Sequence, residues 1–212
     1  MSLNFTTWNM QSHTTITGPL DLATETNADI LALQEIPTNI ANSSNPTHAM
    51  FNDLAHTQGY TPIFSEHTIT LIKQSTLGTH HLTDLSQDTN GRVQTHVFIT
   101  DTDSYMAVIN IYGWQQQHPN YTNNTTKLIE HLNTTVDKLN NTYNTPQLVV
   151  LGDLNVDLRE HAHNKSPNIL EFFQAPPKSL FPATTLHHHD IPSTHQAGAH
   201  HDYCLTSSSL TH

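Results

Sequence analysis

The sequence predicts an α/β fold, and three observations carry this prediction. Residues 148–151 form a continuous aliphatic run, which is typical of a strand buried on both faces. Residues 123–140, just before it, predict an amphipathic helix because apolar side chains recur there at helical spacing: Leu128, Leu132, Val136 and Leu139. Residues 92–100 and 105–112 predict a β-hairpin, since two β-rich segments flank a turn-forming Asp-Thr-Asp-Ser stretch.

The buried strand ends in the polar sequence Gly152-Asp153-Leu154-Asn155. Gly152 allows a sharp exit from the strand, and Asp153 and Asn155 project to one side if the backbone stays extended. The carboxyl ends of strands in open α/β sheets are common positions for functional sites. The competing interpretation is an ordinary Gly-Asp turn after a strand.

The other elements follow from short apolar runs and chain breakers. Strands are expected at residues 3–10, 30–33, 60–64, 67–72 and 202–205, and helices at residues 20–25, 47–58 and 168–173. Residues 39–46 and 181–195 are expected to be loops, and residues 77–90 loop or poorly regular strand. We expect a single domain over residues 1–212.

Composition favours a soluble intracellular protein. Apolar residues make up 35% of the 212 residues, and no apolar run approaches the ~18 residues of a membrane span. The N-terminus has neither a charged nor an apolar signal-peptide region. Cys204 is the single cysteine and cannot form an internal disulfide.

The chain contains 18 histidines, which raises the question of a zinc site. Histidines cluster at residues 161–163, 187–189 and 200–201, but no paired cysteines or His-Glu-x-x-His helix accompany them. The abundant residue types, Thr, Asn, His, Gln and Pro, can all be encoded by codons made of A and C. We therefore attribute the histidines to a coding strand poor in G rather than to zinc.

A formal net charge of −11 argues against a broad basic surface for nucleic acid. Binding to DNA is therefore expected to be weak. The charge does not exclude an enzyme that meets phosphate through a metal ion.

Polar side chains stand at the ends of several predicted strands, and together they suggest one site: Asn9, Glu35, Tyr112, Asp153, Asn155 and Asp202. Carboxylates and carboxamides without thiols suit a hard cation such as Mg²⁺ or Mn²⁺. Such an ion neutralises charge on a phosphoryl group while a carboxylate orients the attacking water. Taken singly, each residue except Asp153 has a simpler interpretation as a cap, a solvated charge or a core side chain.

These motifs resemble those of the endonuclease/exonuclease/phosphatase superfamily. The matching pieces occur in the family's order: Trp8-Asn9, Leu33-Gln34-Glu35, Asn110-Ile111-Tyr112, Gly152-Asp153-Leu154-Asn155 and His201-Asp202-Tyr203. The resemblance implies a four-layered α/β sandwich, in which two mostly antiparallel sheets pack face to face with helices outside.

The resemblance also implies roles for the site residues. Glu35 would bind Mg²⁺ or Mn²⁺, and Asn9 would help to place metal and phosphate. Asp153 would position or activate the water, and Asn155 and Tyr112 would contact the scissile phosphate. Asp202 would orient a catalytic histidine.

Two departures from the family pattern concern that histidine. Ala199-His200-His201 replaces the usual Ser-Arg-Ile-like lead into the late aspartate, and no terminal Ser-Asp-His signature occurs before His212. We expect a domain cut short before its last strand, and His200 or His212 remains an alternative partner for Asp202.

Within the superfamily, Gly91-Arg92-Val93 leading into the hairpin is most similar to the endonuclease domains of non-LTR retrotransposon polyproteins. This resemblance implies a monomeric DNA-nicking enzyme, nuclear and fused to a reverse transcriptase in the full element, which leaves 3′-hydroxyl and 5′-phosphate ends. The alternatives are an inositol-polyphosphate 5-phosphatase-like enzyme and a catalytically inactive remnant or binding domain.

Overall fold

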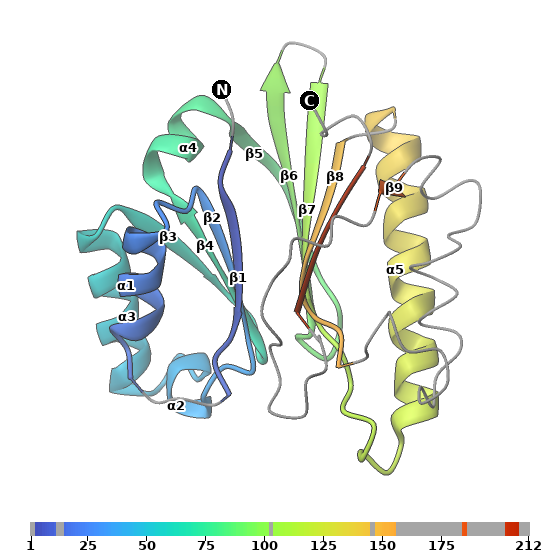
Figure 1. Ribbon diagram of the computed structural model, residues 1–212, viewed down its shortest axis with the longest axis horizontal. Coiled ribbons are helices and arrows are strands. Elements are labelled where there is room, and N and C mark those ends of the chain that lie inside the picture. Colours follow the sequence, from blue (N-terminus) through green and yellow to red (C-terminus); the bar gives the residue numbers. More distant parts are fainter. Residues whose placement is uncertain are drawn as a thin grey trace.

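A computed structural model describes residues 3–11, 15–101, 104–144, 147–155, 184–185 and 202–207. These residues form two mixed β-sheets that face each other, with helices on the outer faces (Figure 1). The α/β sandwich expected from the family resemblance is thus confirmed. Both sheets are mainly antiparallel, and each contains one parallel strand pair.

The first sheet has four strands in the order β1-β2-β4-β3. Their bounds are Phe5–Asn9 for β1, Ile30–Gln34 for β2, Tyr60–Phe64 for β3 and Thr68–Lys73 for β4. β1 and β2 run parallel, so their carboxyl ends lie at the same edge.

The second sheet has six strands in the order β5-β6-β7-β8-β10-β9. Their bounds are His81–Gln87 for β5, Val93–Asp101 for β6, Ser104–Tyr112 for β7, Gln147–Asp153 for β8, Thr184–Thr185 for β9 and Asp202–Ser207 for β10. β7 and β8 run parallel, and β10 pairs antiparallel with β8.

Helices cover the outer face of each sheet (Figure 1). The helices α1 (Gly18–Glu25) and α3 (Pro46–Thr57) bury Leu20 and Phe51 against the first sheet. The helix α5 (Tyr121–Tyr143) covers the second sheet with the apolar stripe that its periodicity predicts. The described residues also form two short helices, α2 (Thr38–Ala41) and α4 (Gln74–Thr79).

Local sequence explains how the main helices begin and end. Asn45 caps α3, since its side chain accepts a hydrogen bond from the Thr47 amide at 2.9 Å, and Pro46 occupies the first turn. Asn144 ends α5 in the left-handed conformation, with φ 51°.

The element predictions are confirmed for most of the described chain, and one was wrong. Residues 39–46, expected to be a loop, begin with part of α2, because Ile40 is buried and anchors a single turn. Residues 77–90, expected to be a loop or a poorly regular strand, contain the end of α4 and the strand β5, whose pairing register shifts between Leu82 and Asp84. The second alternative for this segment is therefore confirmed.

Gly152 was predicted to give a sharp exit from the buried strand, and this was wrong. The strand β8 continues through Gly152, which pairs with Ile111 on one side and Tyr203 on the other. Its φ is 141°, and a Cβ atom there would lie 2.0 Å from the Ile111 carbonyl oxygen. Glycine is required because β7 and β8 approach too closely for a side chain.

No helix of the described residues is long and apolar enough to cross a membrane. The predicted helix at residues 168–173 lies outside the described residues. Of the predicted loop at residues 181–195, only Thr184–Thr185 is described, and it forms β9. The histidine clusters at residues 161–163, 187–189 and 200–201 also fall outside, as does His212.

Candidate active site

Strand directions bring the predicted site residues to one edge of the sandwich. Asn9 ends β1 and Glu35 directly follows β2, so the two parallel strands deliver them together. Tyr112 and Asp153 end the parallel strands β7 and β8 and are in register. Asp202 begins the antiparallel strand β10 directly opposite Asp153.

Asp153 lies at the centre of this arrangement and is only 3% exposed. Its Oδ2 accepts a hydrogen bond from Asn9 Nδ2 at 2.5 Å, which joins the two sheets. Its Oδ1 accepts from the backbone amide of Asn155 at 2.7 Å. Both carboxylate oxygens are therefore held, and the carboxylate has a fixed orientation.

Asn155 does not continue the strand, so the extended backbone assumed from the sequence was wrong. Its φ is 54°, and the chain turns back on Asp153 as an Asx-type turn. The Asn155 side chain instead donates from Nδ2 to the Gly113 carbonyl at 3.0 Å. This bond fixes the carboxamide beside the segment that carries Tyr112.

Glu35 and Tyr112 form the second pair of the site. Glu35 is partly buried, adopts a φ of 54° and hydrogen-bonds to the Tyr112 side chain. The pKa of Tyr112 is raised to about 12, chiefly by burial and then by the charge of Glu35, with a smaller contribution from Asp153, whereas the charge of Arg92 acts in the opposite direction. Tyr112 therefore keeps its proton at neutral pH and is a hydrogen-bond donor.

Hydrogen bonds to Gln11 and Asp153 fix the orientation of the Asn9 side chain. Its Oδ1 accepts from the Gln11 amide at 2.7 Å, and its Nδ2 faces Asp153. Among the described residues, no group of three or more His, Cys, Asp or Glu side chains is placed to hold a metal ion. The oxygen donors of Glu35, Asp153 and Asn9 nevertheless match the chemistry that a hard cation prefers.

A buried polar bridge lies directly behind the site. Gln34, the residue before Glu35, donates from Nε2 to Asn110 Oδ1 at 2.8 Å. Asn110 Nδ2 in turn donates to the Leu33 and Ile69 carbonyls and to Thr70 Oγ1. The bridge connects β2 and β4 of the first sheet with β7 of the second, and thereby fixes Glu35 relative to Tyr112.

Two residues beside the site were not predicted as site residues. Arg92 packs under Tyr112, with its guanidinium carbon 4.4 Å from the ring centroid. The His67 ring centroid lies 6.3 Å from that of Tyr112, and burial, followed by the charge of Arg92, lowers the pKa of His67 while Glu66 and Asp88 oppose this. The Gly91-Arg92-Val93 pattern marked Arg92 as part of the family resemblance but gave it no role in the site, whereas no sequence signal marks His67.

Comparisons with known proteins identify the family and the fold. A sequence model of the Endonuclease/Exonuclease/phosphatase family matches residues 6–212. A search of curated proteins gave no match.

Several solved structures share the fold at low sequence identity. An AP endonuclease from Archaeoglobus fulgidus is 18% identical, with a TM-score of 0.59 over 98% of this chain and 88% of the other. The endonuclease domain of TRAS1, a telomere-specific non-LTR retrotransposon, is 13% identical, with a TM-score of 0.61 over 98% and 86%. A 3′-5′ exonuclease from Neisseria meningitidis is 15% identical, with a TM-score of 0.64 over 97% and 87%.

The family match spans residues 6–212, which is nearly the whole chain, and solved structures share the fold. This chain belongs to the endonuclease/exonuclease/phosphatase family.

Proposed function

We propose that this protein is a metal-dependent endonuclease that nicks DNA, of the kind found in non-LTR retrotransposon polyproteins. The observation that carries the proposal is the Asp153 carboxylate, which is buried and held at both oxygens beside Glu35 and Tyr112. A carboxylate fixed in this way can orient a water molecule for attack on phosphorus. The similarity to the TRAS1 endonuclease domain supports the choice of DNA as substrate.

In this proposal, the water attacks the phosphorus and the bond from phosphorus to the 3′ oxygen breaks. Asp153 orients the water and receives its proton, and the products are a 3′-hydroxyl and a 5′-phosphate. Asn155 and the protonated Tyr112 donate hydrogen bonds to phosphate oxygens, where negative charge develops. The leaving 3′ oxygen takes up a proton from solvent. Asp202, whose backbone pairs with that of Asp153, keeps the role that the family resemblance implies, which is to orient a catalytic histidine.

Glu35 would hold the Mg²⁺ or Mn²⁺ ion, and Asn9 would help to orient both the ion and Asp153. When bound, the ion would supply a positive charge for the phosphate in a protein whose own net charge is −11. Binding to DNA is accordingly expected to be weak and to follow DNA shape, with the chain acting as a nuclear monomer fused to a reverse transcriptase.

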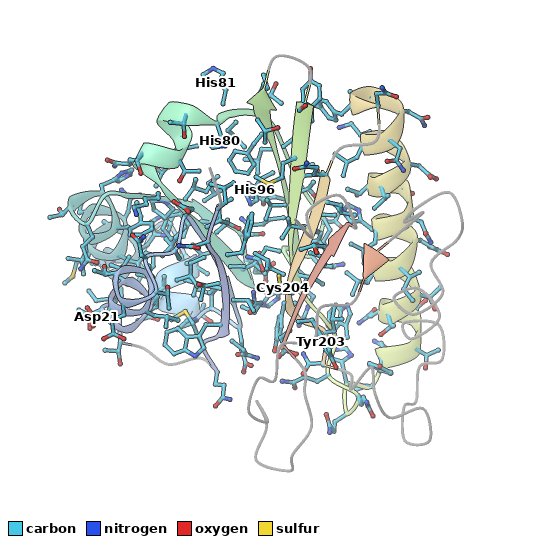
Figure 2. The ribbon with its side chains drawn as sticks, turned by 45° about the horizontal axis from the view of Figure 1, so that its top comes forward. Asp21, His80, His81, His96, Tyr203 and Cys204 are labelled. Carbon is cyan, nitrogen blue, oxygen red and sulfur yellow. The ribbon has the colours of Figure 1, made fainter. Side chains whose placement is uncertain are left out.

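The test is nicking of supercoiled plasmid in Mg²⁺ by the wild-type chain and by Asp153→Ala. The wild type should nick, and Asp153→Ala should lose on the order of 10³-fold or more of the rate, since it removes the group that handles the water. Asp21→Ala is the matched control, because Asp21 is an exposed carboxylate on the outer helix α1 (Figure 2).

Equal nicking by wild type and Asp153→Ala would contradict the proposal. Phosphate release from an inositol polyphosphate without plasmid nicking would point to the 5-phosphatase-like alternative. A folded chain that does neither would point to an inactive binding domain.

A further inference from the structure

Arg92 enters the site in a fixed geometry set by the turn before β6. The backbone amides of Arg92 and Val93 both donate to Asp88 Oδ1, at 2.6 and 2.8 Å. Gly91 adopts a φ of 62°, and a Cβ atom there would lie 2.7 Å from the Glu66 Cβ atom. Only glycine allows this close approach, so the turn holds Arg92 firmly at the base of the site.

The guanidinium group is enclosed by the segment that follows β7. Its carbon lies 4.4 Å from the Tyr112 ring centroid and 3.8 Å from that of Trp114. Nη1 donates to the Tyr112 carbonyl at 3.2 Å and to the Gly113 carbonyl at 2.9 Å. Arg92 therefore contacts three consecutive residues, 112–114, through two aromatic rings and two backbone carbonyls.

The opposite side of the same segment is fastened to the catalytic strand β8. The Gly113 carbonyl that accepts from Arg92 also accepts from Asn155 Nδ2, and the Gly113 amide donates to the Asp153 carbonyl at 2.7 Å. A Cβ atom at Gly113 would lie 2.2 Å from the Leu154 carbonyl oxygen. One carbonyl oxygen thus couples the position of Arg92 to that of Asn155.

The burial of Arg92 favours a role in positioning other residues over direct contact with DNA. The residue is only 8% exposed, and its Nε is buried without a hydrogen-bond partner among the described residues. If Arg92 served stability alone, a well-packed apolar residue could replace it with little loss of folding free energy. Its two carbonyl bonds and two ring contacts instead fix the relative positions of residues 112–114.

We propose that Arg92 is a positioning residue, which sets Asn155 and Tyr112 for the phosphate through the Gly113 carbonyl and the Tyr112 ring. This inference deepens the proposed function and rests on it for its catalytic consequence. Its structural part, the coupling of Arg92 to Asn155, can be measured without any turnover.

The first measurement follows the Asn155 side-chain amide by NMR in the full chain, with the resonance identified by its loss in Asn155→Asp. Arg92→Met should shift this resonance, and Arg92→Lys should shift it less, because an ammonium cannot bond both carbonyls while stacking on two rings. Lys73→Met is the matched control, since Lys73 is an outlying cation bound to Asn27 Oδ1. An Asn155 amide that stays in place in both Arg92 variants would overturn the inference, and Arg92→Lys decides alone if Arg92→Met does not fold.

The second measurement is the rate of nicking at saturating Mg²⁺. Arg92→Met should lower kcat about 10- to 100-fold with little change in KM, because it misplaces groups rather than removing a DNA contact. In the Asn155→Ala background, Arg92→Met should lower kcat by a smaller factor than in the wild type, because the part of its effect that acts through the Gly113 carbonyl and Asn155 is already lost and only the part through Tyr112 remains. If the two substitutions lowered kcat by independent factors that multiply, or if Arg92→Met affected only KM, the positioning role would be contradicted. An inactive wild type would defeat the proposed function, but the coupling measured by NMR would still stand.

Discussion

The two ends of the layer between the sheets are built from opposite chemistry. The site end consists of Gln34, Thr70, Gln94, His96 and Asn110, which are completely buried and joined by hydrogen bonds. The far end contains Ile30, Ile72, Phe98, Met106 and Val149, which belong to an apolar cluster that extends along β8 to Leu151. Figure 2 shows His96 inside this layer, with Cys204 on β10 of the second sheet.

Both ends come from the same strands, since inward-facing residues alternate along each of them. On β7, Met106 lies at the far end and Asn110 at the site end, and on β6 Phe98 and Gln94 do the same. Apolar contacts stabilise the sandwich but tolerate sliding of one sheet over the other, whereas hydrogen bonds have fixed partners. We infer that the far end supplies stability and that the site end fixes how the two halves of the active site meet.

The strongest test of this difference between the two ends is to shorten a buried side chain at the far end. Phe98→Ala removes a fully buried ring and should lower the free energy of unfolding by about 3–5 kcal/mol. Chemical denaturation measures this loss. Nicking per folded molecule should stay near wild type, and a large fall in kcat under conditions where the variant is fully folded would show that the far end also sets the site.

A smaller loss of stability with a larger loss of activity is expected at the site end. Asn110→Leu leaves the Gln34 amide without its acceptor, which should cost about 1–3 kcal/mol and loosen Glu35 relative to Tyr112. Denaturation and plasmid nicking, measured on the same preparation, separate the two effects. Met106→Leu on the same strand is the control, and it should lower the free energy of unfolding by less than about 1.5 kcal/mol. Full nicking activity in Asn110→Leu would refute the role of the Gln34–Asn110 bridge in positioning the site.

The smallest expected effect is a dependence of the free energy of unfolding on pH, which comes from His96 at the site end. Burial lowers the pKa of His96 from 6.5 to about 3, so the folded protein keeps this imidazole neutral while the unfolded chain protonates it below about pH 6.5. Falling pH therefore favours the unfolded state, by about 0.7 kcal/mol between pH 7 and pH 6 for this group, and the loss continues down to about pH 3.

Comparison of wild type with His96→Met isolates this contribution. The variant should lose less stability than wild type as the pH falls, and His81→Gln, which removes an exposed imidazole from β5 (Figure 2), controls for the loss of one histidine. Identical pH profiles for wild type and His96→Met would show that His96 is not held neutral.

Much of the fold could be predicted because burial imposes a period on the sequence. The strand β8 reads as a continuous aliphatic run, and α5 repeats apolar residues at helical spacing. By contrast, β5 is rich in Ser, Thr and Asp, and its pairing with β6 overrides these weak local preferences. The turn α2 likewise depends on the burial of Ile40, which no local pattern specifies.

The candidate site was predictable only where local sequence marks a strand end. Asn9, Glu35, Tyr112 and Asp153 follow apolar runs, so their positions could be predicted, although their roles stay predictions. Gln34 and Asn110 lie 76 residues apart, and only the stacking of two sheets brings them into contact. Arg92 was missed because a lone arginine usually lies at the surface, and its burial depends on two rings that the fold supplies.

Cys204 gives this protein an internal reporter of how firmly β10 is attached. It is the single cysteine of the sequence, lies partly buried opposite Leu151 of β8, and burial raises the pKa of its thiol. Thiol reagents attack the thiolate, so the partial burial of the thiol and its raised pKa both slow labelling, and separation of β10 from its neighbour should speed it. The labelling rate of the unmodified chain therefore responds to the opening of the strand on which Asp202 stands, without any introduced probe.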